Sequence, residues 1–186
     1  MKIGGIMVYR NNVLVNNKSY IDSITITNYL TLYLNELLND KEYLSMQKYI
    51  QHGTTNCIEH SIAVTHYSIV LSHRLHMKVN YKSLIFGALL HDYFLYDWHE
   101  KESAHKWHGF IHPKIALKNS IKRWQLDDIQ KDIIKCHMFP LTILSIPKYK
   151  ESLIVCFIDK LCATYETFVK KKPYKNLKKL YNLKFK

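Results

Sequence analysis

Apolar residues recur at helical spacing along most of this chain. Leu30, Leu34, Leu37 and Leu38 lie on one face of a helix that begins near Thr27. The same period predicts further helices at residues 41–51, 56–75, 81–91, 113–124, 128–137 and 150–170, and a tail helix beyond Pro173. This pattern predicts an all-α fold.

Residues that favour helix ends support several of these boundaries. Asn56 can cap the helix that follows it, and Asp127 or Asp128 can cap the next-to-last long one. Pro113 suits the first position of a helix, and two prolines bracket a loop at residues 140–147.

The two ends of the chain differ from its middle. Residues 1–25 predict a loose leader or a short hairpin that turns at Asn11-Asn12, and residues 171–186 predict a lysine-rich tail helix. Between them, residues 26–170 form the predicted domain, and a chain of 186 residues is long enough for one core.

The composition is that of a globular protein. Hydrophobic residues make up 47% of the chain, and no stretch approaches the roughly 20 apolar residues that span a bilayer. The apolar run at the start is too short for a signal peptide, so we expect a cytoplasmic protein without a membrane partner. The four cysteines form no CxxC pair, and we expect free thiols.

The positive charge is concentrated in the tail. Residues 170–186 hold eight of the 27 basic residues, and the rest of the chain has 19 basic against 15 acidic residues. Such a tail can bind nucleic acid, but we favour a solvated helix without that role. The sequence does not indicate an oligomeric state.

Several residues with metal-binding chemistry lie at inward positions of the predicted helices. His60 shares its face with apolar residues, which fits either a core histidine or a ligand. His91 and Asp92 close an apolar run, where an ionised carboxylate is costly unless it is paired or coordinated. Asp159 has small apolar neighbours one turn away on both sides, which is unusual for a surface aspartate. His112 and His137 lie at predicted helix ends, where they suit capping, core packing or metal binding.

The ordered set of His60, His91-Asp92 and Asp159 resembles the HD-domain superfamily of metal-dependent phosphohydrolases. The surrounding segments strengthen the likeness to bacterial members, and some of them resemble a mainly uncharacterised firmicute branch. These segments are Gln51-His52-Gly53-Thr54-Thr55, Gly87-Ala88-Leu89-Leu90-His91-Asp92, Asp92-Tyr93-Phe94-Leu95-Tyr96-Asp97-Trp98-His99, His108-Gly109-Phe110-Ile111-His112-Pro113, His137-Met138-Phe139-Pro140-Leu141-Thr142 and Ile158-Asp159-Lys160. The resemblance covers roughly residues 45–168.

The resemblance implies a helical bundle around a central metal site. One divalent ion would be held by His60, His91, Asp92 and Asp159, and a second, bridged by Asp92, by His112 and His137. Imidazole and carboxylate ligands suit Fe, Mn, Ni, Co or Zn. The chain departs from the branch that cleaves cyclic dinucleotides, because no GYP motif follows His137.

The predicted function is the metal-dependent hydrolysis of a small phosphate ester, a nucleotide above all. Lys160 follows a candidate ligand directly and can offset phosphate charge, and His52 and His108 can line the pocket as proton donors or supporting groups. Two alternatives stay open. Some HD proteins use the same six ligands as di-iron oxygenases, and the chain could also be a non-catalytic module that binds nucleic acid or another anion.

Overall fold

The computed structural model describes residues 17–99, 107–169 and 173–181, with side chains from residue 28 on and at Ile26. Helices make up nearly all the regular secondary structure of the described residues, which confirms the predicted all-α class. Its helices are α1 (Asn17–Leu38), α2 (Lys41–Ser45), the short 3-10 helix η1 (Met46–Lys48), α3 (Cys57–Arg74), α4 (Tyr81–Leu90), α5 (His108–Arg123), α6 (Asp128–Cys136), α7 (Lys150–Phe168) and α8 (Lys175–Leu180). Two short strands, β1 (Ile50–His52) and β2 (Thr55–Asn56), pair in antiparallel fashion.

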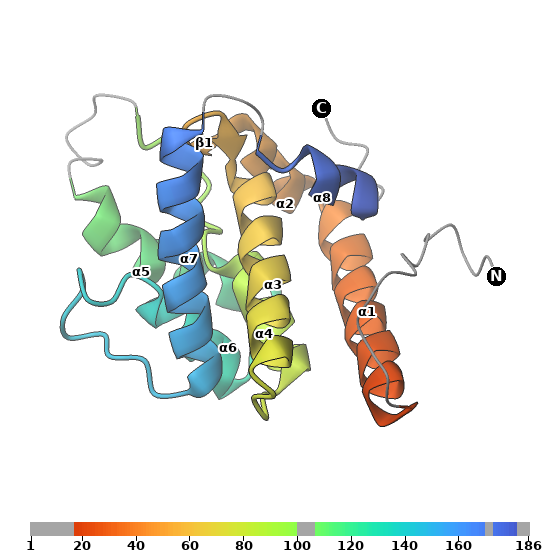
Figure 1. Cartoon of the computed structure of the whole chain (residues 1–186). Helices are drawn as coiled ribbons and strands as arrows, with labels where there is room; N and C mark the ends of the chain where they lie inside the picture. Colours follow the sequence, from red (N-terminus) through yellow and green to blue (C-terminus); the bar gives the residue numbers. More distant parts are fainter. Residues whose placement is uncertain (1–16, 100–106, 170–172, 182–186) are drawn as a thin grey trace.

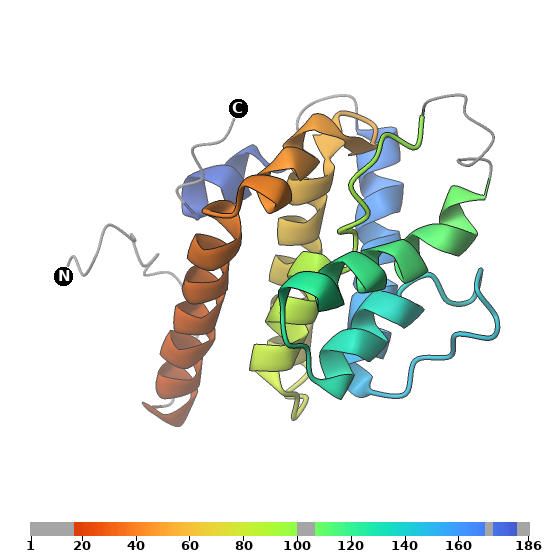
Figure 2. The same ribbon diagram turned by 180° about the vertical axis from the view of Figure 1, so that it is seen from behind.

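The helices pack as a bundle around α3, α4 and α7. α3 packs on α4 and α7, while α6 packs on α4, α5 and α7 (Figures 1 and 2). α1 lies at one edge against α4, and α5 and α6 lie at the opposite edge (Figure 2). Helices distant in sequence therefore meet at the centre of the bundle.

The predicted caps of two central helices are confirmed. The side chain of Asn56 accepts a hydrogen bond from the backbone N–H of Glu59, whose carboxylate accepts one from the backbone N–H of Asn56. Asp127 and Gln130 form the same reciprocal arrangement at the start of α6. Each box satisfies backbone donors that a helix start leaves without partners.

α4 is buried from Ser83 to Leu90, and its end delivers two polar residues to the centre of the bundle. Gly87 allows this close packing, because a Cβ at that position would lie 2.8 Å from the Cδ1 atom of Ile133 on α6. His91 and Asp92, which follow the last turn of α4, are therefore buried among the neighbouring helices.

The region before α3 differs from the prediction. We expected a helix over residues 41–51, but α2 ends at Ser45 and residues 50–56 form a tight hairpin. The turn includes Gly53 at a φ of +57°, a conformation that glycine adopts without strain. A side chain there would also collide with the carbonyl oxygen of Glu166 on α7.

α5 begins at His108, five residues before the start predicted at Pro113. Pro113 lies in the second turn, where its missing N–H removes only the bond to the carbonyl of Gly109. The earlier start puts His108 and His112 one turn apart on one helix. Their rings stack with centroids 4.4 Å apart and an interplanar angle of 11°.

The chain ends were predicted only in part. α1 begins at Asn17, about ten residues earlier than its apolar period indicated, so residues 17–25 are helical rather than a leader. The predicted hairpin around Asn11-Asn12 lies outside the described residues. In the tail, α8 packs on the bundle through buried Leu177, and Lys178 forms an ion pair with Glu59 on α3.

The structure also bears on the predictions about the cysteines and about membrane-spanning helices. All four cysteines are free and buried, as expected. Among the described helices, none has the length and apolar character needed to span a bilayer.

Candidate metal centre

The six predicted ligand residues meet in the middle of the bundle. They come from five elements: His60 from α3, His91 and Asp92 from the end of α4, His112 from α5, His137 from the end of α6, and Asp159 from α7. None of the six residues is more than 6% exposed. Such dense burial of charged and polar groups is costly unless they are paired or coordinated.

One half of the cluster joins two histidines and two aspartates. The Nε2 atom of His60 lies 3.0 Å from Oδ1 of Asp159 and 3.6 Å from Oδ2 of Asp92. The Nε2 atom of His91 lies 3.6 Å and 3.3 Å from the same two oxygens. These four atoms therefore face one small volume.

The other half joins the remaining histidines to the second oxygen of Asp92. The Oδ1 atom of Asp92 lies 3.3 Å from Nε2 of His112 and 3.6 Å from Nε2 of His137. The two Nε2 atoms are 2.8 Å apart. Asp92 thus presents one carboxylate oxygen to each half, which is the geometry of a bridging ligand.

All four imidazoles are held in place through the nitrogen that points away from the cluster. The Nδ1 atom of His60 lies 2.9 Å from a carboxylate oxygen of Glu166. The Nδ1 atoms of the other three lie 2.7 or 2.8 Å from backbone carbonyl oxygens of Ala88, His108 and Ile134, respectively. These acceptors favour a proton on Nδ1, so the neutral form of each ring directs its Nε2 lone pair into the cluster.

Divalent cations bind lone pairs of the kind that the neutral imidazoles and the carboxylates direct into this cluster. The Nε2 atom of His91 and the Oδ1 atom of Asp92 are buried and make no hydrogen bond to the described chain. The close Nε2 atoms of His112 and His137 repel each other when both rings are neutral. A divalent cation would relieve both conditions, and imidazole with carboxylate suits Mn, Fe, Co, Ni or Zn. The residues present therefore fit the implied metal.

Burial and mutual charge shift the ionisation of the cluster in opposite directions. Burial alone would lower the pKa of His91, but the adjacent carboxylates of Asp92 and Asp159 raise it to about 9. Burial lowers the pKa of His137 to about 3, with His112 and His91 acting in the same direction. Burial would raise the pKa of Asp92, yet the surrounding histidines, His91 first, hold it well below its usual range. The aspartates are therefore anionic near neutral pH.

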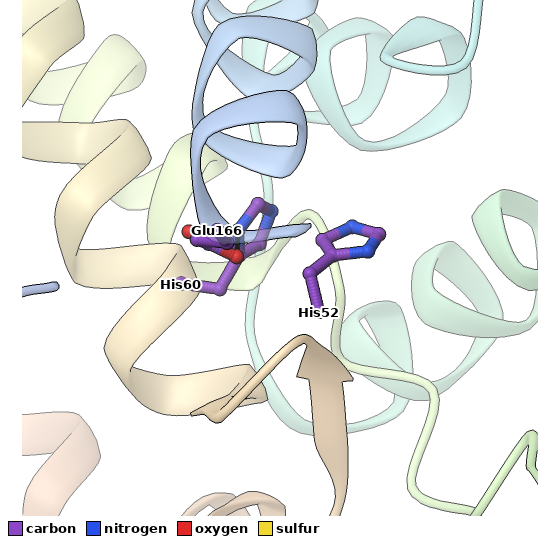
Figure 3. A group of neighbouring side chains, drawn as sticks. All are labelled: His52, His60 and Glu166. Atoms are coloured by element: carbon purple, nitrogen blue, oxygen red, sulfur yellow. Dashed lines mark hydrogen bonds and ion pairs between the residues drawn. The ribbon is translucent and has the colours of Figure 1, made fainter. Parts of the chain in front are cut away.

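Two residues at the site were not predicted. Glu166 is fully buried and contacts His60 where α3 meets α7, with His52 rising from β1 beside them (Figure 3). Glu166 follows Asp159 by seven residues, two helical turns on the same face, so its position could have been inferred from helical spacing. Gln51 donates to Oδ2 of Asp92 at 2.6 Å from the β1 strand, which no sequence signal predicted.

A cavity of about 700 Å³ opens above the cluster. Asp92, His112, His137 and Asp159 form part of its lining, so this half-open space reaches the candidate ligands. The cavity is the size of a small-molecule site.

The three residues predicted to assist the chemistry all line this cavity. The Nζ atom of Lys160 donates to the carbonyl oxygen of His137 at 2.6 Å and lies 3.9 Å from Oδ2 of Asp159. His52 presents its ring edge to His60, with centroids 5.3 Å apart, and burial lowers its pKa. The His108 ring stacks on the ring of His112, with centroids 4.4 Å apart, and on the ring of Trp98, with centroids 5.0 Å apart.

Comparison with known proteins gives one match. The profile of a family described as HD domain matches residues 57–164, more than half of the 186-residue chain. No curated protein and no solved structure matches the chain. The six cluster residues and Lys160 all lie within the matched range, whereas Gln51, His52 and Glu166 lie outside it. The resemblance to a firmicute branch stays a prediction.

Proposed function

Because this chain belongs to the HD-domain family, a superfamily of metal-dependent hydrolases, we propose that it is a phosphohydrolase that cleaves a small phosphate ester. One observation carries the proposal. Four histidine Nε2 atoms and the carboxylates of Asp92 and Asp159 converge beside an open cavity, with the ammonium of Lys160 next to them.

The centre would hold one or two divalent ions. His60, His91, Asp92 and Asp159 would bind the first, and Asp92, His112 and His137 the second. When bound, such an ion lowers the pKa of water towards neutrality and offsets charge on a phosphoryl oxygen. The buried carbonyl and carboxylate partners of the imidazoles keep these ligands oriented before an ion arrives.

Lys160 would bind the phosphate. Its ammonium lines the cavity and is held by the carbonyl oxygen of His137, so it is oriented without being neutralised by that contact. A fixed cation beside the reacting phosphorus stabilises the charge that develops on its oxygens. His52 and His108 line the same cavity and would donate hydrogen bonds to the ester or its leaving group.

The lining of the cavity supports a monophosphate ester. Of the lysine and arginine side chains in the described chain, Lys160 is the one in the lining, and one cation matches one phosphate better than a polyphosphate. Met138, Pro140 and Leu141 form an apolar part of the wall, where an organic group of nucleoside size would fit.

The test is a substrate screen on protein with a defined metal content. Protein purified without chelator is analysed for bound metals, stripped, and reloaded separately with Mn, Fe, Co, Ni or Zn. Release of phosphate from nucleoside monophosphates and simple phosphate esters is then measured for each preparation. We expect hydrolysis with at least one metal and none after stripping. Loaded protein that hydrolyses no phosphate ester would contradict the proposal.

A second candidate function is oxygen chemistry at a di-iron centre. The observation that favours it is the position of Asp92, with one carboxylate oxygen facing each half of the cluster. An iron-loaded protein that consumes oxygen and gives a mixed-valent iron signal, without phosphatase activity, would favour this candidate.

A further inference from the structure

The outward face of α7 carries a row of large apolar side chains. Leu153, Phe157, Leu161 and Tyr165 follow one another at four-residue spacing, and Phe168 extends the row to the end of the helix. These five residues, which we name the α7 stripe, are between 51% and 79% exposed. α7 lies at the front of the bundle in the view of Figure 1, and no described element crosses in front of it.

The α7 stripe is unusual because it contains no charge. From Leu153 to Phe168, the other exposed positions of α7 are Thr164 and Thr167. Solvent-facing sides of surface helices normally carry charged residues, and single exposed apolar residues need no explanation. A continuous uncharged row along a whole helix does need one.

The loop that leads into α7 carries further exposed apolar side chains. Ile143, Leu144 and Ile146 are between 62% and 95% exposed. The loop is attached to α7, because the Cys156 thiol lies 3.0 Å from the carbonyl oxygen of Phe139 and the loop ends at the start of the helix.

The size of this surface matches a protein interface. The five stripe residues and the three loop residues are eight side chains, each at least half exposed. At about 200 Å² each, they leave roughly 1,000 Å² of apolar surface. The largest apolar patch on an ordinary monomer is about 300–600 Å². A stable interface buries about 800 Å² on each partner.

We propose that the α7 stripe is the core of a homodimer interface in which α7 packs antiparallel against α7 of a second copy. A two-fold axis between Phe157 and Leu161 would set Phe157 against Leu161 of the partner subunit. The same axis would set Leu153 against Tyr165 of the partner subunit. Each of these contacts joins an aliphatic to an aromatic side chain, so the row from Leu153 to Tyr165 is complementary to itself, as a two-fold interface requires.

A second copy suits this surface better than a charged partner. The stripe offers no ionic contact, whereas its four-residue rows can interdigitate with the same rows on another α7. Asp159, Cys162 and Glu166 occupy the inner face of the same helix. Dimerisation therefore uses a face that the metal centre leaves free.

The experiment measures the mass of the full chain by sedimentation equilibrium between about 1 and 100 μM. We expect a dimer for the unmodified protein. Phe157→Glu and Leu161→Glu should each raise the dimer dissociation constant by about a hundredfold or more, because a charge would be buried at the centre of the interface. Both side chains are exposed in a single copy, so helical content by circular dichroism and metal content should not change.

The matched control is Leu32→Glu on α1, where the leucine is 58% exposed and outside the stripe. This variant should remain a dimer. The proposal is overturned if the unmodified protein is a monomer at all concentrations. If Phe157→Glu then also lowers the melting temperature, another segment of the same chain covers the stripe. A dimer that persists in both stripe variants would overturn it as well.

Discussion

Glu166 and His60 lie 106 residues apart in sequence, yet the Nδ1 atom of His60 is 2.9 Å from Oε1 of Glu166. Both side chains are fully buried. A buried carboxylate behind an imidazole fixes the ring and makes its other nitrogen a stronger ligand. Glu166 is therefore a positioning residue for the metal centre.

Glu166→Gln should weaken metal binding by about tenfold to a hundredfold, because an amide is a weaker acceptor and lacks the carboxylate charge. Affinity is measured by competition with a chromogenic chelator. Thr164→Gln, at an exposed position of the same helix, is the control and should bind metal as the unmodified protein does. Equal affinities in all three proteins would show that Glu166 does not position His60.

His137→Ala should reduce the bound metal from two ions to one. The variant removes one of the two imidazoles that face Oδ1 of Asp92, while His60, His91 and Asp159 keep their contacts. The metal-to-protein ratio is measured by mass spectrometry of the elements in dialysed samples. A metal-to-protein ratio of one in both the unmodified protein and the variant would show that the centre binds a single ion without His137.

Metal binding at pH 7 should release at least one proton. The pKa of His91 in the metal-free protein is raised to about 9, so the ring is protonated at pH 7 and must lose that proton to coordinate. His137, with its pKa lowered to about 3, is already neutral and releases none. Affinity should consequently rise with pH as His91 loses its proton near pH 9. Burial alone would lower the pKa of His60, but the carboxylates of Glu166 and Asp159 raise it well above its usual range, so loss of its proton adds to the rise.

Calorimetric titration in buffers of different ionisation enthalpy counts these protons. The observed heat should depend on the buffer at pH 7, and the dependence should weaken as the pH rises through 9. A heat that is independent of the buffer at pH 7 would contradict the protonation of His91.

Lys160→Ala should lower kcat/KM for the best phosphate ester by about tenfold or more, equivalent to about 1.4 kcal/mol of transition-state binding. The reason is the loss of the cation that lines the cavity beside Asp159. Steady-state kinetics measure the effect, with Lys131→Ala on the exposed side of α6 as a control of equal charge change. If Lys160→Ala has the same kcat/KM as the unmodified protein, Lys160 does not bind the phosphate.

Much of this arrangement follows from helical periodicity. The inward positions of His60 and Asp159 predicted that they face the core, and the structure brings both to one cluster with His91, Asp92 and the two further histidines. Their role as ligands stays a prediction. The caps at Asn56 and Asp127 were also predictable, since each depends on residues within one turn.

Features that depend on contacts between distant segments were missed. The hairpin that carries Gln51 and His52 requires Gly53 to pass close to the backbone of Glu166, a contact absent from any local pattern. The start of α5 was misplaced because Pro113 usually marks a first turn, although a helix tolerates it where one backbone bond is lost. Glu166 is the exception, because its spacing from Asp159 was available in the sequence.

The metal content of Asp159→Ala tests the central claim most directly. Asp159 supplies the oxygen that lies 3.0 Å from His60 and 3.6 Å from His91, so its loss opens the first half of the cluster. Both proteins are stripped, reloaded with the preferred metal, dialysed and analysed for metal, with helical content checked by circular dichroism. The account predicts that the variant keeps its helices and loses most of the bound metal. Full metal occupancy in Asp159→Ala would contradict it.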